Sequence, residues 1–159
     1  MITQEALKDI FLLDEFGRLV RKNDSNRSKA GSFSKTKDRY GYVLVSIKNK
    51  TYLAHRLVWL FVHGSWPDGD IDHINRIKDD NRPINLRIAS KSQSRQNIGV
   101  QKNNKSGFKG VWLHKQTGKW CSSISINKKN KHLGSFNTKE EAHLAYVTAS
   151  KVLHDFNIF

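Results

Sequence analysis

The chain places an acidic residue, Asp72, directly before a histidine, His73, and this pair has the chemistry to cut a phosphodiester bond. Such a reaction needs an attacking water, a base that deprotonates it and a cation that neutralises the leaving oxygen. His73 suits the base, because a histidine titrates near working pH, and Asp72 is a hard oxygen ligand of the kind that Mg²⁺ or Mn²⁺ prefers. Since neighbouring residues of a strand point to opposite sides, we expect the strand to end or bend at this pair.

The elements that follow the Asp72-His73 pair must hold its side chains in position. After a polar loop, the sequence predicts a return strand over Asn85–Ile88 and a helix over Ser90–Asn97. Two loop residues, Asn81 and Asn85, have two interpretations: turn residues that close the loop with their side chains, or parts of the site. An Asp-His dipeptide by itself is usually a surface pair, so its sequence neighbours carry the functional interpretation.

The segment before the pair predicts strands and one helix. Ala54–His63 is apolar at helical spacing and is stopped by Gly64 and Pro67. His55, inside this helix, is interpreted as a hydrogen-bonded core residue rather than a ligand. Residues 1–50 predict a strand-rich entry with a polar loop over 22–39, which adds DNA contacts in this interpretation. The strands expected there are Phe11–Leu13, Leu19–Val20, Tyr42–Ile47 and Thr51–Leu53.

The carboxy-terminal third predicts a small sheet with one helix. A linker rich in Gly and Asn is expected over 98–106. Thr138, with Glu141 three residues later, forms the capping-box pattern that opens a helix. Trp120 and Phe136 are interpreted as core residues. The strands expected before this helix are Gly110–His114, Trp120–Asn127 and Lys131–Phe136.

The charge of the chain predicts a polyanionic partner. It carries 28 Lys and Arg against 14 Asp and Glu, a formal net charge of +14, and the sequence pI is about 10.0. Residues 81–139 contain thirteen Lys and Arg and no Asp or Glu. A solvated surface usually mixes both signs, and the basic region lacks the pattern of a membrane-surface helix. Nothing resembles a signal peptide or a membrane span, and the single Cys121 excludes an internal disulfide.

Several motifs in order give the segment from about Phe11 to Asn97 a resemblance to the HNH endonucleases, in particular the phage-type homing enzymes. The motifs are Ala54-His55-Arg56-Leu57-Val58-Trp59, Trp66-Pro67, Asp72-His73-Ile74-Asn75, Asp80-Asn81-Arg82 and Asn85-Leu86-Arg87. The resemblance implies a ββα-metal fold with one divalent cation, Mg²⁺ or Mn²⁺. It makes His73 the general base, Asp72 a metal ligand and Asn85 the residue that braces the loop and orients the histidine.

One position departs from the family pattern. The second metal ligand of the family is usually an Asn or His on the helix, and counting from Asp72 places it at Ser94. A Ser hydroxyl is a weaker ligand than an amide carbonyl. Asn97 lies three residues further, on the same face of the predicted helix, and is the residue we expect to replace it. The alternatives are that Ser94 holds the metal through water or that the site is damaged.

The last third resembles the APETALA-type DNA-binding domain of plant ethylene-response factors, which also occurs fused to phage HNH nucleases. The resemblance covers roughly residues 107–156 and rests on Ser106-Gly107-Phe108-Lys109-Gly110-Val111, Gly118-Lys119-Trp120, His132-Leu133-Gly134-Ser135-Phe136, Glu140-Glu141-Ala142 and Ala145-Tyr146. It implies a three-stranded sheet in the major groove with the helix behind it. Most of the family's base-reading arginines are absent, since Trp112 and His114 stand where the plant domains often carry Arg.

The sequence as a whole predicts an α+β protein of two modules. These are an HNH nuclease module over 1–97, a linker over 98–106 and a DNA-binding module over 107–159. The DNA-binding residues expected are Arg82, Arg87, Arg95, Lys109, Trp112, His114, Lys115, Lys119, Lys128, Lys129 and Lys131. We expect a monomeric, phage-encoded homing endonuclease that acts on double-stranded DNA in the cytoplasm of a bacterial host. The rival interpretations are a DNA-binding protein that acts by occupancy and a protein that binds and cuts structured RNA.

Overall fold

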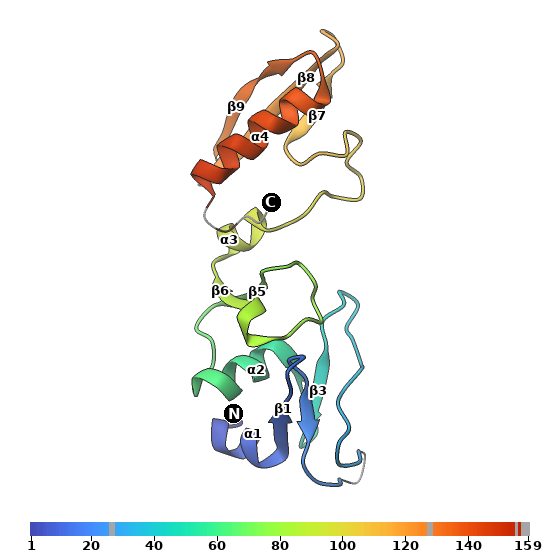
Figure 1. The fold of residues 1–159 in the computed structure, drawn as a ribbon, viewed down its shortest axis with the longest axis vertical. Helices are drawn as coiled ribbons and strands as arrows, with labels where there is room; N and C mark the ends of the chain where they lie inside the picture. The colour runs from blue at the N-terminus through green and yellow to red at the C-terminus, as the bar shows by residue number, and fades with distance from the viewer. Residues whose placement is uncertain (26–27, 127–128, 155, 157–159) are drawn as a thin grey trace. The chain divides into compact units, whose positions relative to one another are not determined.

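The fold combines small antiparallel sheets with helices, in agreement with the predicted α+β class. The structure is a computed structural model that describes residues 1–25, 28–126, 129–154 and 156 (Figure 1). Within these residues there are three two-stranded sheets, one three-stranded sheet and four α-helices. None of the helices in this part of the chain is long and apolar enough to cross a membrane.

The chain divides into two compact units, residues 1–90 and 91–159. The helix predicted over Ser90–Asn97 is present as α3 (Lys91–Gln96) and falls in the second unit. The end of the nuclease module at residue 97 and the start of the DNA-binding module at residue 107 stay a prediction.

The first unit is built from three hairpins and two α-helices. Its elements are α1 (Gln4–Ile10), β1 (Phe11–Leu13), β2 (Leu19–Arg21), β3 (Leu44–Ile47), β4 (Lys50–Leu53), α2 (Ala54–His63), β5 (Asp70–His73), the 3-10 helix η1 (Pro83–Asn85) and β6 (Leu86–Ala89). Strand β1 pairs with β2, β3 with β4 and β5 with β6, all antiparallel. Helix α2 has the predicted bounds and ends at Gly64, whose left-handed φ of 78° stops the helix.

Two elements of this unit were missed by the sequence analysis. Residues 1–50 were expected to be strand-rich, but they begin with α1, whose N-cap Thr3 accepts a hydrogen bond from the backbone of Ala6. The return strand was expected to begin at Asn85. Pro83 instead opens η1, so Asn85 closes a 3-10 turn and the strand β6 begins at Leu86.

The core of the first unit lies where α1 and α2 pack together against the hairpins (Figure 1). Leu7 of α1 and both Leu57 and Val58 of α2 are fully buried. Truncating a buried leucine such as Leu57 to alanine costs about 2–5 kcal/mol, because the lost apolar contacts leave a cavity. This core supports the end of α2 and the hairpin β5–β6, which carries the Asp-His pair.

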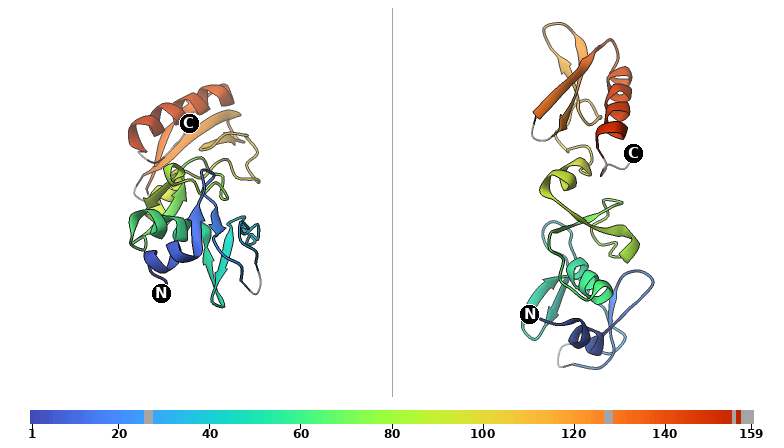
Figure 2. Two further views of the ribbon diagram at one scale, coloured as in Figure 1. Left: turned by 60° about the horizontal axis from the view of Figure 1, so that its bottom comes forward. Right: turned by 90° about the vertical axis from the view of Figure 1, so that its left-hand side faces the viewer.

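The second unit contains α3 and the predicted three-stranded antiparallel sheet with one helix packed on it (Figure 2). Its elements after α3 are β7 (Val111–His114), β8 (Lys119–Ile126), β9 (Lys129–Phe136) and α4 (Lys139–Leu153). The predicted capping box is present, because Thr138 accepts from the backbone of Glu141 and Glu141 accepts from the backbone of Thr138.

The core of this unit is thin, as its small size predicts. Ile124 of the sheet and both Ala142 and Tyr146 of α4 are buried. Trp120 and Phe136, expected in the core, are only half-buried. Gly110 allows close packing, since a Cβ there would lie 2.3 Å from the ring of Tyr146.

Candidate active site

The hairpin β5–β6 holds Asp72 and His73 at the end of a strand. The register pairs Asp72 with Arg87 and His73 with Leu86. Strand β5 ends at His73, as expected, but the two side chains still occupy different faces, because Ile71 and His73 are buried while Asp72 is only half-buried. The pair therefore presents a carboxylate on one face of the hairpin and an imidazole on the other.

Side-chain hydrogen bonds close the loop between β5 and β6. Asn85 donates from Nδ2 to the carbonyl of Asp80 at 2.7 Å and to Oδ1 of Asn75 at 2.9 Å. Its Oδ1 accepts from the backbone N–H of Asn75 at 2.9 Å. Asn85 is buried, so these bonds satisfy a polar group that would otherwise be costly. The geometry is that of a residue that braces the loop.

His73 is enclosed in a buried polar cluster. Its Nε2 lies 3.0 Å from Oδ1 of Asn81, and both residues are buried. The ring of His55 meets it edge-on, with centroids 5.2 Å apart, and the ring of Tyr42 lies 5.8 Å away. Asn81 thus contacts the imidazole directly. Asn85 braces the loop, and its expected part in orienting the histidine stays a prediction.

His55 is a core residue, as expected, but its hydrogen bonding is incomplete. Its Nδ1 is buried and has no hydrogen-bond partner among the described residues. Burial, with smaller contributions from the nearby His73 and Arg56, lowers the pKa of His55 to about 4. His55 is thus neutral at pH 7 and adds no charge next to His73.

Asp72 is held by a cation of the return strand. Its Oδ2 accepts from Nε and Nη2 of Arg87, each at 2.9 Å, and the carboxylate side chain is 12% exposed. The described residues contain no cluster of three or more His, Cys, Asp or Glu that could hold a metal ion. A single protein carboxylate still fits Mg²⁺, which is commonly bound by one or two carboxylates together with substrate phosphates and water.

The helix residues expected to complete a metal site belong to the second unit. Asn97 follows α3 and is buried, and its backbone N–H donates to the carbonyl of Gln93 at 3.4 Å. Ser94 is half-buried within α3. The order strand, loop, strand and helix of a ββα unit is therefore present, and the joint metal site of Asp72 with Asn97 stays a prediction.

The three arginines expected to contact DNA near this site differ in their ion pairs. Arg82 donates to both carboxylate oxygens of Asp80, at 2.8 Å and 2.6 Å. This pairing lowers the pKa of Asp80 to about 2 and raises the pKa of Arg82. Arg87 is paired with Asp72, and Arg95 is exposed on α3.

The other expected DNA-binding residues lie in the second unit and divide into groups. By strand register, Trp112, His114 and Lys119 share the sheet face opposite the buried Val111. Lys129 pairs with Ile126 and Lys131 pairs with Ile124, so these two lysines lie on the same sheet face as Val111. Lys115 lies in the turn after β7. Lys109 donates from Nζ to the carbonyl of Gln96 at 2.6 Å. Lys128 lies outside the described residues.

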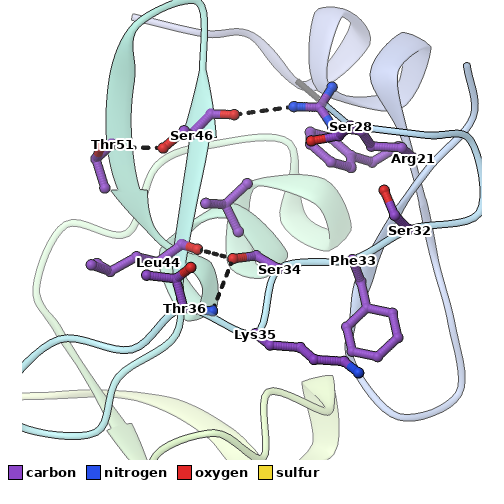
Figure 3. A pocket seen from close by; sticks show the side chains of 12 residues that line it. Arg21, Ser28, Ser32, Phe33, Ser34, Lys35, Thr36, Leu44, Ser46 and Thr51 are labelled. Carbon is purple, nitrogen blue, oxygen red and sulfur yellow. Dashed lines mark hydrogen bonds between the residues drawn. The ribbon is translucent and has the colours of Figure 1, made fainter. Parts of the chain in front are cut away.

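Within the predicted polar loop, residues 28 and 32–36 form one wall of a pocket in the first unit, and the β3–β4 hairpin forms another (Figure 3). The pocket has a volume of about 420 Å³ and is rich in hydroxyl groups. Arg21 donates from Nη2 to the carbonyl of Ser46 at 3.2 Å, and Ser34 donates to the carbonyl of Leu44. With Lys35 at its edge, the pocket offers two cations and several hydroxyls, which suits an anionic ligand.

Comparison with known proteins bears on the segment that carries the Asp-His pair. Residues 52–96 match the HNH endonuclease family model. This HNH segment begins in β4 and runs through α2, β5, β6 and α3, so it contains Asp72, His73, Asn81 and Asn85. No curated protein and no solved structure matches the chain. The HNH match supports a nuclease and implies DNA as its substrate.

The tertiary structure adds a glycine to this site that the sequence analysis did not identify. Gly17, in the β1–β2 turn, has a φ of +75°, and a Cβ there would lie 2.2 Å from the backbone carbon of Asn81. The turn thus packs directly on the backbone of the residue that contacts His73. A Gly after Asp14-Glu15-Phe16 predicts a turn, but no local pattern predicts this approach.

Proposed function

We propose that this protein is a metal-dependent endonuclease that hydrolyses phosphodiester bonds of double-stranded DNA. The observation that carries the proposal is the HNH match over residues 52–96, in which His73 stands at the end of β5 with Asn81 bound to its ring. Occurrence in a phage and a homing role belong to the same proposal and rest on the sequence resemblance.

In this mechanism His73 takes the proton of the attacking water. Asn81 fixes the ring orientation, and with Oδ1 of Asn81 as acceptor the proton of the neutral ring lies on Nε2, which makes Nδ1 the basic nitrogen. Because His55 is neutral at pH 7, it does not repel the imidazolium that forms. Asn85 keeps the loop closed around this histidine.

Asp72 would hold the divalent cation, Mg²⁺ or Mn²⁺, and Asn97 of the second unit would be its partner ligand, with Ser94 as the alternative. When bound, such a cation neutralises charge that develops on the phosphate and the leaving oxygen. Arg87 fixes the position of the Asp72 carboxylate through Oδ2.

The second unit would supply most of the DNA affinity, following its resemblance to the APETALA-type domain. The exposed sheet face with Trp112, His114 and Lys119 is the surface that corresponds to the major-groove face of that family. Lysines that contact phosphates position a protein without reading sequence. The pocket at Arg21 and Lys35 in the first unit would add further backbone contacts.

The experiment that tests the proposal is cleavage of supercoiled plasmid with Mg²⁺ or Mn²⁺ and with a chelator. The natural chain is compared with His73→Ala and with His63→Ala, an exposed histidine at the end of α2. We expect relaxed or linear product that requires metal, is lost in His73→Ala by about 10²-fold or more, and is retained in His63→Ala.

The rival function, DNA binding by occupancy without cleavage, is favoured by Ser94, which replaces the family's usual metal ligand. Tight binding with no metal-dependent product on any DNA would support this rival. In that case Ser94→Asn should create metal-dependent cleavage if the missing ligand is the only defect.

A further inference from the structure

The sheet of the second unit has one face that packs on α4 and an opposite, open face. Helix α4 packs on the face that carries the buried Ile124. By register, the open face holds Trp112 and His114 of β7, Lys119, Cys121 and Ser123 of β8, and His132 of β9. Trp112 is the largest of these side chains and is 42% exposed. Single exposed apolar residues are common on proteins, so this exposure alone assigns no function.

The ring of Trp112 lies across the middle of the open face. Its strand β7 and the strand of His132, β9, are separated by β8, which puts their backbones about 9–10 Å apart. The two ring centroids are only 6.2 Å apart, so both side chains lean over β8. Cys121, the register partner of Trp112, is 5% exposed although α4 packs on the opposite face. The indole therefore covers β8 with one side and presents its other side to solvent.

The charge and the width of this sheet fit duplex DNA. Residues 111–136 contain five Lys and no Asp or Glu, which favours a polyanionic partner. The major groove, about 12 Å wide, admits a two-stranded ribbon such as β7–β8, whereas the minor groove, about 6 Å wide, is too narrow for it. A ring on the open face of this ribbon therefore meets base edges in the major groove.

The side chains of the open face decide which base edge suits Trp112. The commonest specific contact in the major groove is Arg or Lys to guanine. No arginine follows Arg95 in the chain, and Lys119 pairs with His114, two residues along the strand from Trp112. An indole ring instead offers an apolar surface, and the apolar group that a base pair displays in the major groove is the C5-methyl of thymine.

We infer that Trp112 determines specificity: its indole packs on the C5-methyl group of a thymine in the major groove, so that the protein prefers a T·A pair at that position. The choice of duplex DNA as the partner rests on the proposed function. Burying one methyl group against the ring should change the affinity about fourfold.

The test measures binding of the full-length protein to duplex DNA in the presence of a chelator, so that no cleavage intervenes. Selection from a library of random duplexes first gives the preferred sequence. Each thymine is then replaced by uracil, which deletes only the methyl group, and fluorescence anisotropy gives the dissociation constants. We expect uracil at one position to weaken binding about fourfold. In a duplex with C·G at that position, 5-methylcytosine should strengthen binding by a similar factor.

Variants connect the methyl group to the ring. Trp112→Ala should bind the thymine and uracil duplexes equally, whereas Trp112→Phe keeps an aromatic ring and should retain most of the preference. Leu113→Ala is the matched control and should retain all of it, because Leu113 is 45% exposed on the same strand but lies on the opposite face. Comparing both duplexes with each protein removes the effects of DNA shape and of overall affinity.

Three results would overturn the inference. If the natural chain binds thymine and uracil duplexes equally at every position, it reads no methyl group, and this result needs no variant. If Trp112→Ala folds and keeps the preference, another residue reads the methyl group. Tighter binding of single-stranded than of duplex DNA would show that the ring stacks on unpaired bases. None of these results depends on cleavage, so failure here is distinct from failure of the plasmid assay.

Discussion

At the scale of single residues, Asp72 and Asp70 form a natural comparison within one strand. Both belong to β5, two residues apart, and so share a face of the hairpin. Asp70 is exposed, whereas the Asp72 carboxylate is fixed by Arg87 at 2.9 Å. A carboxylate in a fixed position can serve a cation, while an exposed one is more simply a solvated charge.

Asp72→Asn should therefore lower metal-dependent cleavage by about 10²-fold, because an amide cannot supply the negative charge that holds a cation near the phosphate. Asp70→Asn is the matched control and should change the rate by less than about threefold. Initial rates of plasmid relaxation measure both. Equal effects of the two substitutions would show that Asp72 acts only through the general charge of the strand.

His55 predicts a dependence of stability on pH. Its pKa falls from 6.5 to about 4 in the folded protein, mainly because burial disfavours the charged ring. The unfolded chain therefore binds more protons between these values, and stability falls as the pH drops below about 6.5. The loss between pH 7 and pH 5 should be on the order of 2 kcal/mol.

Urea unfolding of the natural chain and of His55→Phe at the two pH values measures this loss. The phenylalanine cannot be protonated, so its unfolding free energy should change much less between pH 7 and pH 5. A natural chain that is equally stable at both values would contradict the assignment of a neutral, buried His55.

At the scale of elements, the β1–β2 turn supports the loop that carries Asn81. Gly17 and Gly31 have almost the same left-handed backbone, with φ of +75° and +76°, but only Gly17 has backbone atoms within 4 Å of the position of an added Cβ. Replacing either glycine by alanine incurs the left-handed strain of about 1–2 kcal/mol. The two positions therefore separate backbone strain from loss of packing.

Gly17→Ala should destabilise the protein more than Gly31→Ala. It should also displace the backbone of Asn81 and, with it, the side-chain Oδ1 that contacts the ring of His73. We expect a further loss of about 1–3 kcal/mol from overpacking and a reduced cleavage rate at full DNA affinity. Thermal unfolding and single-turnover cleavage measure the two effects. Identical behaviour of the two variants would show that the turn does not support the site.

At the scale of the whole molecule, a net charge of +14 predicts that DNA binding depends strongly on salt. If six to ten phosphates are contacted, affinity falls by roughly 10³- to 10⁵-fold between 50 and 200 mM salt. Lys119→Gln, on the exposed sheet face, should reduce the salt slope by about one. Lys139→Gln, at the start of α4 and 3.9 Å from Glu140, is the control and should leave the slope unchanged.

Fluorescence anisotropy across a salt series measures these slopes. The same titration with duplex DNA and structured RNA as competitors tests the remaining rival function. A duplex preference supports a DNA enzyme, whereas tighter binding of structured RNA would move the proposal to an RNA-directed nuclease.

The local sequence by itself determined most of the elements and the location of the candidate site. The bounds of α2, the capping box at Thr138 and the order of β5, loop, β6 and α3 depend on neighbours within a few residues, so local patterns predict them. The tertiary structure alone decided that Asn81 contacts His73, that Gly17 packs on Asn81, and that Trp112 meets His132 across β8. These contacts join residues far apart in the chain, and only the packing of whole elements brings their side chains together.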